Sequence, residues 1–263
     1  MISYNSAKYF CIITTTIHTM SYLNYIFVSN FNYSYLASFL GYFLITTLIT
    51  NVIKTMGKDT NFYLEGEKRT EFNLVDYVKT IGVNSFSYYL IVNNVCYESQ
   101  NIQTDIIYFI PKSFIYELIF DFGHYWTHRI LHTYPILYRY IHKKHHTNNL
   151  INVYTSFDHT ATDYLITNTM PLYLTTYIFP MSKYQFTVQF IYKTLTEIGG
   201  HSGKISKANN FPQFIWVTQF FGIELNNKDH NNHHINPMCN FSKRFSLWDK
   251  VFNTYQYVNN EEN

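Results

Sequence analysis

The stretch Asp121-Phe-Gly-His124-Tyr-Trp-Thr-His128-Arg-Ile-Leu-His132 decides how this chain is interpreted. Its polar residues recur every three or four positions, as they do along one face of an α-helix, and Glu117 extends the same stripe by one turn. Histidines one turn apart lie about 6 Å apart along the helix axis, so two imidazoles can converge on one metal ion. The opposite face is predicted to be apolar and consists of Ile115, Leu118, Phe122 and Trp126.

Two further histidine groups follow, His142-Lys-Lys-His145-His146 and His230-Asn-Asn-His233-His234. Each places three imidazoles at positions i, i+3 and i+4, which share one face if the segment is helical. Neutral imidazole binds iron, zinc, copper and nickel, so the residue type leaves the metal open. A zinc ion takes three or four protein ligands. The eight histidines at 124, 128, 142, 145, 146, 230, 233 and 234 exceed what one ion holds. The pattern therefore predicts two metal ions.

Other polar residues have narrower expected roles. We expect Asp121 to orient one of the metal-bound histidines, because such imidazoles commonly donate their second N–H to a carboxylate. The zinc-peptidase pattern His-Glu-x-x-His is absent. His18 lies in an apolar run, and we expect it to pack in the protein rather than bind metal. Cys11, Cys96 and Cys239 are widely spaced and odd in number, so they predict reduced, buried thiols without a disulfide framework.

The composition of the 263-residue chain favours a membrane protein of one domain. Hydrophobic residues make up 47% and charged residues only 14%, whereas about 25% of a soluble domain is charged. A net charge of +2, with no basic run interleaved with aromatic residues, argues against nucleic acid as a partner. The chain shows no sign of a cleaved signal peptide, so we expect the first apolar segment to remain as an anchor.

Charge-free segments long enough for a bilayer lie at the start of the chain. Tyr9 to Val28 and Ser29 to Ile53 contain no Asp, Glu, Lys or Arg, and each matches the roughly 20 residues of a membrane span. They predict a transmembrane hairpin within residues 1–57 that turns near Asn30 and Asn32.

The rest of the chain, residues 58–263, is predicted to be the catalytic region, beginning with a charged, solvated connector from Lys58 to Glu71. Two shorter apolar segments predict helices that are tilted, kinked or re-entrant: Ile81 to Val95, and Ile106 to Phe120, which Pro111 and Lys112 interrupt. The segment Tyr164 to Tyr192 predicts a helical hairpin or two half-spans. Basic residues concentrate at 129–144 and 243–250, beside the histidine groups, and the positive-inside tendency places these groups on the cytoplasmic side.

The three histidine groups, with Arg129 after the first and Trp248-Asp249 after the third, resemble the fatty acid hydroxylase/sterol desaturase superfamily over residues 120–257. Within that superfamily the chain looks most similar to sterol C-4 methyl oxidases. The stretches that carry this likeness are His128-Arg-Ile-Leu-His132, Tyr138-Arg-Tyr-Ile-His142-Lys-Lys-His145-His146 and Glu197-Ile-Gly-Gly-His201-Ser-Gly.

Two positions bear on the choice within the superfamily. A histidine at the position of His124 favours the C-4 oxidases over sterol C-5 desaturases, which usually lack it. The chain departs from the family at His159, which is followed by Thr-Ala-Thr-Asp163 where relatives have proline and then an acidic residue two positions after the histidine. This departure leaves the role of His159 and the exact substrate open.

The resemblance implies an all-α, integral-membrane helical bundle with a cytosol-facing, histidine-rich cap that binds two iron ions. The implied metal ligands are His124, His128, His142, His145, His146, His201, His230, His233 and His234. The residues expected to orient these ligands or to add to them are Asp121, His132, His159 and Asp249.

The implied activity is O2-dependent oxidation of an unactivated C–H of a lipid, foremost a sterol C-4 methyl group. The chain contains no Gly-x-Gly-x-x-Gly fingerprint or cytochrome b5 module, so electrons are expected from NAD(P)H through cytochrome b5 and its reductase, at the endoplasmic reticulum membrane. The alternatives are a sterol C-5 desaturase or a fatty acyl or sphingolipid hydroxylase of the same superfamily. A more distant alternative is a non-enzymatic, histidine-rich membrane protein that binds metal.

Overall fold

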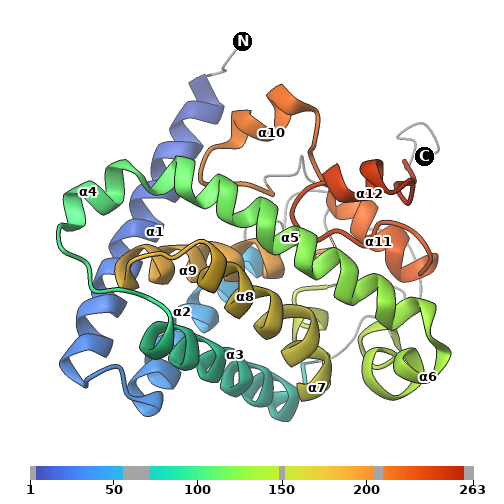
Figure 1. Cartoon of the computed structure of the whole chain (residues 1–263), viewed down its shortest axis with the longest axis horizontal. Helices are drawn as coiled ribbons and strands as arrows, with labels where there is room; N and C mark the ends of the chain where they lie inside the picture. Colours follow the sequence, from blue (N-terminus) through green and yellow to red (C-terminus); the bar gives the residue numbers. More distant parts are fainter. Residues whose placement is uncertain (1–3, 56–71, 148–151, 204–209, 258–263) are drawn as a thin grey trace.

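The computed structural model describes residues 4–55, 72–147, 152–203 and 210–257, and all regular secondary structure in these ranges is helical (Figure 1). The prediction of an all-α fold is therefore confirmed. The α-helices are α1 Tyr4–Asn30, α2 Tyr35–Thr55, α3 Leu74–Asn94, α4 Ile102–Ile107, α5 Phe109–Thr133, α6 Pro135–Leu137, α7 Ala161–Tyr164, α8 Met170–Ile178, α9 Lys183–Gly200, α10 Ile215–Phe221, α11 Asn227–Ile235 and α12 Leu247–Val251. Between them lie the π-helical turns η1 Tyr138–His142 and η4 Leu165–Thr169 and the 3-10 turns η2 His145–Thr147 and η3 Thr155–Phe157.

The first two helices form the expected hairpin. The chain reverses after Asn30, where Asn32 and Tyr33 both have a φ of 51°, a left-handed conformation that asparagine tolerates better than most residues. Helix α2 is the one helix in the described ranges that is long and apolar enough to cross a membrane by length and composition. The predicted connector from Lys58 to Glu71 lies outside the described residues.

Helix α9 lies in the middle of the bundle and packs against α1, α2, α3 and α4 (Figure 1). It begins with a capping box, in which Ser182 and Gln185 satisfy each other's backbone amides. Tyrosines from the surrounding helices donate to or accept from its threonines, as in Tyr42 Oη to Thr194 Oγ1 at 2.9 Å and Tyr88 Oη to Thr187 Oγ1 at 2.7 Å. These pairs satisfy hydroxyl groups that apolar segments rich in tyrosine and threonine bring into the core.

Pro111 and Lys112 interrupt the apolar run from Ile106 to Phe120, but the helix is not broken there. The break falls earlier, at Tyr108 between α4 and α5, and Pro111 lies in the first turn of α5. A proline is tolerated there because the first amides of a helix have no intrahelical partner. Helix α5 therefore continues unbroken for 25 residues and carries the whole first histidine group. The segment Tyr164 to Tyr192 does form two helices, α8 and the first half of α9, of which α8 packs on α5.

Helix α5 has its polar face inward and its apolar face outward. The stripe predicted from the sequence is buried along its whole length, namely Glu117, Asp121, His124, His128 and His132. On the opposite face the exposed fraction is 46% for Ile115, 41% for Phe122 and 37% for Trp126. This is the reverse of a soluble amphipathic helix, and it directs the histidines into the protein interior.

Candidate metal centre

One group of five buried histidines is assembled from four separate segments. Each of the five offers a ring nitrogen, and these nitrogens all lie within 4.8 Å of one another. The members are His128 and His132 of α5, His142 of η1, His146 of η2 and His233 of α11. The sequence-predicted ligands His128, His142, His146 and His233 are thus brought together, and His132 joins them.

The hydrogen bonds of this group fix which nitrogen faces its centre. The Nδ1 atoms of His128 and His233 donate to the carbonyl oxygens of Phe241 and Cys239, at 2.8 and 2.7 Å. His142 Nδ1 lies 2.9 Å from a carboxylate oxygen of Asp163. Because these oxygens accept, each Nδ1 carries the proton and each Nε2 presents a lone pair.

The Nε2 lone pairs converge at a spacing that fits a bound metal ion. His128 Nε2 lies 3.0 Å from that of His142, 3.1 Å from that of His233 and 3.2 Å from that of His132. Lone pairs this close repel unless a cation lies between them. Metal–nitrogen bonds of about 2.1 Å at right angles place two nitrogens about 3.0 Å apart, whereas a tetrahedral site places them about 3.4 Å apart. The geometry favours an ion with five or six ligands.

A second group consists of His145, His201, His230 and His234, whose ring nitrogens also lie within 4.8 Å of one another. His230 Nε2 is 3.0 Å from His201 Nε2, and His201 Nδ1 donates to the Glu197 carbonyl at 2.8 Å. His145 Nδ1 and both ring nitrogens of His234 are buried without any hydrogen-bond partner in the described residues. Buried polar atoms are rarely left unpaired, and a bound metal ion would pair with these nitrogens.

The two groups are adjacent, and the second and third sequence motifs each contribute to both. His146 and His234, from different groups, have ring centroids 4.6 Å apart. The prediction that His142, His145 and His146 share one helical face is wrong, because the chain passes from a π-helical turn into a 3-10 turn between them. His142 and His146 belong to the first group and His145 to the second, and the helical triplet of α11 divides in the same way, with His230 and His234 in one group and His233 in the other.

Burial keeps these imidazoles neutral, as ligand binding requires. It lowers the pKa of His145, His230 and His234 well below 6.5, and repulsion from neighbouring histidines lowers them further. Burial also lowers the pKa of His233, to about 3. At neutral pH all of these rings offer lone pairs.

Asp163 is the carboxylate that orients histidines, and sequence reasoning did not assign it this role. It is fully buried and accepts from His142 Nδ1 at 2.9 Å and from His159 Nδ1 at 3.0 Å. Burial acts to raise the pKa of Asp163, but the hydrogen bonds that it accepts from His142 and His159 outweigh burial and hold the pKa below its usual range. The one feature of the sequence that could have indicated this role is the position of Asp163 four residues after His159.

Asp121 does not orient a histidine, so that prediction is wrong. Its carboxylate accepts from the backbone amides of Lys243, Arg244 and Phe245 at 2.8, 2.9 and 3.0 Å. Asp249 accepts from the amides of Phe241 and Ser242, both at 2.8 Å.

These two aspartates fix the loop that carries the carbonyl acceptors of His128 and His233. Their carboxylates bind backbone amides of residues 241–245, and a carbonyl of the same loop accepts from His128. The two aspartates therefore act on the candidate metal site only through the loop backbone.

Two of the predicted histidines lie outside both groups. His124 donates from Nδ1 to the carbonyl oxygen of Thr167 at 2.7 Å. His159 stacks on His145 with ring centroids 4.1 Å apart, and its Nε2 is buried without a partner in the described residues. Burial, followed by the nearby Lys243 cation, lowers the pKa of His124 well below 6.5.

The remaining sequence expectations concern residues away from the histidine groups. His18 packs in the protein as expected and pairs with the hydroxyl of Tyr184 at 3.1 Å. The three thiols are free as expected, and Cys239 is buried, but Cys11 is exposed, so the prediction of buried thiols is wrong for that residue.

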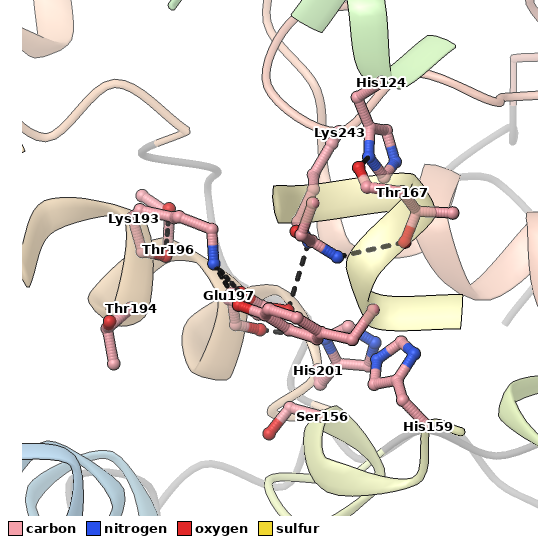
Figure 2. Close-up of polar contacts among 12 residues, drawn as sticks. His124, Ser156, His159, Thr167, Lys193, Thr194, Thr196, Glu197, His201 and Lys243 are labelled. Carbon is pink, nitrogen blue, oxygen red and sulfur yellow. Dashed lines mark hydrogen bonds and ion pairs between the residues drawn. The ribbon is translucent and has the colours of Figure 1, made fainter. Parts of the chain in front are cut away.

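A buried network of charges borders the histidines. Glu197 accepts from Lys193 at 2.8 Å and from Lys243 at 3.1 Å, and Lys243 also donates to Asn168 at 2.7 Å (Figure 2). The only hint in the sequence was the pair of opposite charges at 193 and 197, one turn apart in an otherwise apolar segment. Residue 243 approaches from the far end of the chain, which no local pattern predicts.

Members of the charge network and of both histidine groups line a cavity of about 780 Å³. Its apolar wall comes from α1 and α2 and includes Ile13, Ile17, Met20 and Ile49. Four further lining residues are also solvent-exposed, with exposed fractions of 58% for Tyr9, 51% for Ile12, 52% for Leu48 and 43% for Val52. The cavity therefore opens between the start of α1 and the end of α2, and its size and lining suit a lipid.

The family model described as fatty acid hydroxylase matches residues 113–254, which include every histidine of both groups. A fatty acid hydroxylase of Lecanicillium (vlmA) is 31% identical over 148 residues, 53% of this chain and 40% of that protein. A Delta(7)-sterol 5(6)-desaturase of Schizosaccharomyces pombe is 27% identical over 57% of this chain and 45% of its own length. The lathosterol oxidase of Rattus norvegicus is 25% identical over 52% of this chain and 42% of its length. The chain thus spans less than half the length of these curated relatives, and no solved structure matches it.

Proposed function

The chain belongs to the fatty acid hydroxylase family, and from that premise we propose that it is a membrane-bound di-iron oxygenase that oxidises an unactivated C–H of a lipid. The observation that carries this proposal is the placement of two adjacent histidine groups along the wall of a lipid-sized cavity. The Nε2 atoms lie 3.0 and 3.1 Å apart, the distance expected for two metal–nitrogen bonds at right angles. This distance supports iron, which readily takes five or six ligands, over a tetrahedral zinc site.

The histidines would hold the metals in defined positions. His128, His132, His142, His146 and His233 would bind one ion, and His145, His201, His230 and His234 the other. When bound, two irons supply the O2 activation and the oxidising strength that no side chain possesses.

The protein would supply the environment for this chemistry. Asp163 and the carbonyls of Phe241 and Cys239 hold the rings in the tautomer that binds metal. The apolar wall from α1 and α2 excludes water from the reacting carbon.

We place the protein in a membrane as a multi-pass protein, with residues 1–57 as a hairpin anchor and residues 58–263 as the catalytic region. Helix α2 carries an unbroken outward row of apolar residues with 43–68% of each side chain exposed, namely Leu36, Leu40, Leu44, Leu48 and Val52. The apolar face of α5 is also exposed. Soluble proteins rarely expose contiguous apolar surfaces of this kind, whereas lipid tails cover them.

The substrate we favour is a sterol, oxidised at a C-4 methyl group, in the endoplasmic reticulum with the metal site on the cytosolic side. Electrons would come from NAD(P)H through cytochrome b5 and its reductase. The relatives named above support oxidation of a sterol or a fatty acid, and sterol C-5 desaturation and fatty acyl hydroxylation are the alternative outcomes of a product assay.

The deciding experiment is metal content per chain, measured by elemental mass spectrometry on detergent-purified protein expressed with added iron. We expect two irons in the wild type and none in His145→Ala/His233→Ala, which removes a histidine from each group. His18→Gln, a histidine far from both groups, should keep both irons. Stable zinc without iron or O2 consumption would instead support a metal-binding protein that is not an enzyme.

A further inference from the structure

His124 lies at the boundary between the cavity and the first histidine group but belongs to neither metal-binding group. Its ring lines the cavity, and only 6% of the side chain is exposed. Its centroid lies 5.1 Å from that of His128, the histidine whose Nε2 contacts three others of the first group. A molecule that contacts His124 in this part of the cavity therefore also lies close to the first metal position.

The ring of His124 is held in one orientation by the backbone. Nδ1 donates to the Thr167 carbonyl at 2.7 Å, the contact drawn between these two residues in Figure 2. A carbonyl oxygen only accepts, so Nδ1 carries the proton of the neutral ring and Nε2 is left as an acceptor. No hydrogen bond joins Nε2 to any residue in the part of the chain that the structure describes.

The neighbouring cation, Lys243, makes no hydrogen bond to His124 among the described residues, and its contacts lie elsewhere. Lys243 already donates to Asn168 and to Glu197, at 2.7 and 3.1 Å. Figure 2 shows its side chain reaching past His124 toward Glu197. His124 thus offers the cavity a fixed hydrogen-bond acceptor that has no donor among the residues that the structure describes.

We propose that His124 Nε2 accepts a hydrogen bond from a hydroxyl group of the lipid substrate and thereby positions a carbon a few bonds away from that hydroxyl for oxidation. The inference rests on the proposed function and narrows its substrate class. It selects hydroxylated lipids, such as a sterol whose 3-hydroxyl adjoins C-4, over acyl thioesters, whose thioester group has no hydrogen-bond donor. His124 is then a positioning and specificity residue instead of a metal ligand.

The test compares equilibrium binding of two radiolabelled probes, a 4,4-dimethyl-3-hydroxysterol and its 3-deoxy analogue, to full-length metal-loaded protein in detergent. One net hydrogen bond predicts that the wild type prefers the hydroxysterol by about five- to tenfold. His124→Leu should bind both sterols equally and keep both metal ions. His124→Gln, which retains an acceptor oxygen, should keep part of the preference and remains informative if the leucine variant does not fold.

The same preparations distinguish the possible failures. A metal ion lost from both His124 variants would identify His124 as a ligand and overturn the inference while the proposed function stands. A preference that persists in both variants, with both metals present, would also overturn it alone. A wild type that holds two irons but binds neither sterol would overturn the inference together with the sterol part of the proposed function. The His18→Gln control should match the wild type in every measurement.

Discussion

His145 and His146 are neighbours in the chain, yet their rings belong to different histidine groups, with centroids 5.4 Å apart. The same holds for His233 and His234, whose centroids are 6.1 Å apart. Two short segments therefore couple the two metal positions, and a shift of either backbone moves a ligand of both. The separation of the two histidine groups is fixed by covalent geometry at these two points.

This arrangement predicts how pairs of substitutions combine. Because His146 and His233 share the first group, His146→Ala/His233→Ala should keep the second group and retain about one iron per chain. His145→Ala/His146→Ala touches both groups and should retain none. Elemental mass spectrometry of the two double variants measures this directly, and equal iron loss in both would contradict the division into two groups.

Asp163 should govern the affinity of the first group. Its carboxylate holds His142 and His159 together, and an asparagine has only one acceptor oxygen for the two donors. We expect Asp163→Asn to weaken iron retention about 10- to 100-fold, as measured by the rate and extent of removal by a chelator. Glu98→Gln, at a carboxylate with 68% of its side chain exposed, is the matched control and should behave as wild type.

The metal-free protein should be sensitive to acid. Burial, and then neighbouring histidines, hold the pKa of His145 and His234 well below 6.5 in the folded protein, so these rings are neutral there but take up protons once unfolded. The stabilising contribution is complete above about pH 6.5 and is lost on acidification, by about 1.4 kcal/mol per pH unit for each such histidine.

Thermal unfolding of metal-free protein between about pH 7.5 and about pH 5.5 tests this expectation. The unfolding temperature should fall as the pH falls, and the dependence should be shallower in His145→Gln/His234→Gln. An unfolding temperature that does not change over this range would show that these rings are protonated in the folded state as well.

The cavity mouth between α1 and α2 should control substrate entry. Val52 lines the mouth and is 43% exposed, so Val52→Trp should narrow it and raise KM several-fold without loss of metal. Leu44→Trp makes the same change on the same outward row of α2 but away from the cavity, and should leave KM unchanged. Equal effects of the two substitutions on KM would indicate that substrate enters elsewhere.

Much of the local structure followed from the sequence. The period of Glu117, Asp121 and His128 predicted a helix with one polar face, and the structure has that helix with that face buried. The charge-free runs before residue 54 predicted a hairpin, which α1 and α2 form. These features depend on residues within one or two turns of each other, and the preferences of a short segment suffice to predict them.

Which histidines share a site was decided by the tertiary structure. His124 and His132 occupy the same face of α5, two turns apart, yet only His132 reaches the first group, because α11 and η1 meet α5 at its C-terminal end. The amide partners of Asp121 lie 122 to 124 residues away, and Lys243 reaches Glu197 across 46 residues. Sequence spacing by itself determined the helices and supplied the imidazoles. The pairing of those imidazoles into two sites required the packing of distant segments, whose contacts leave no periodic trace along the chain.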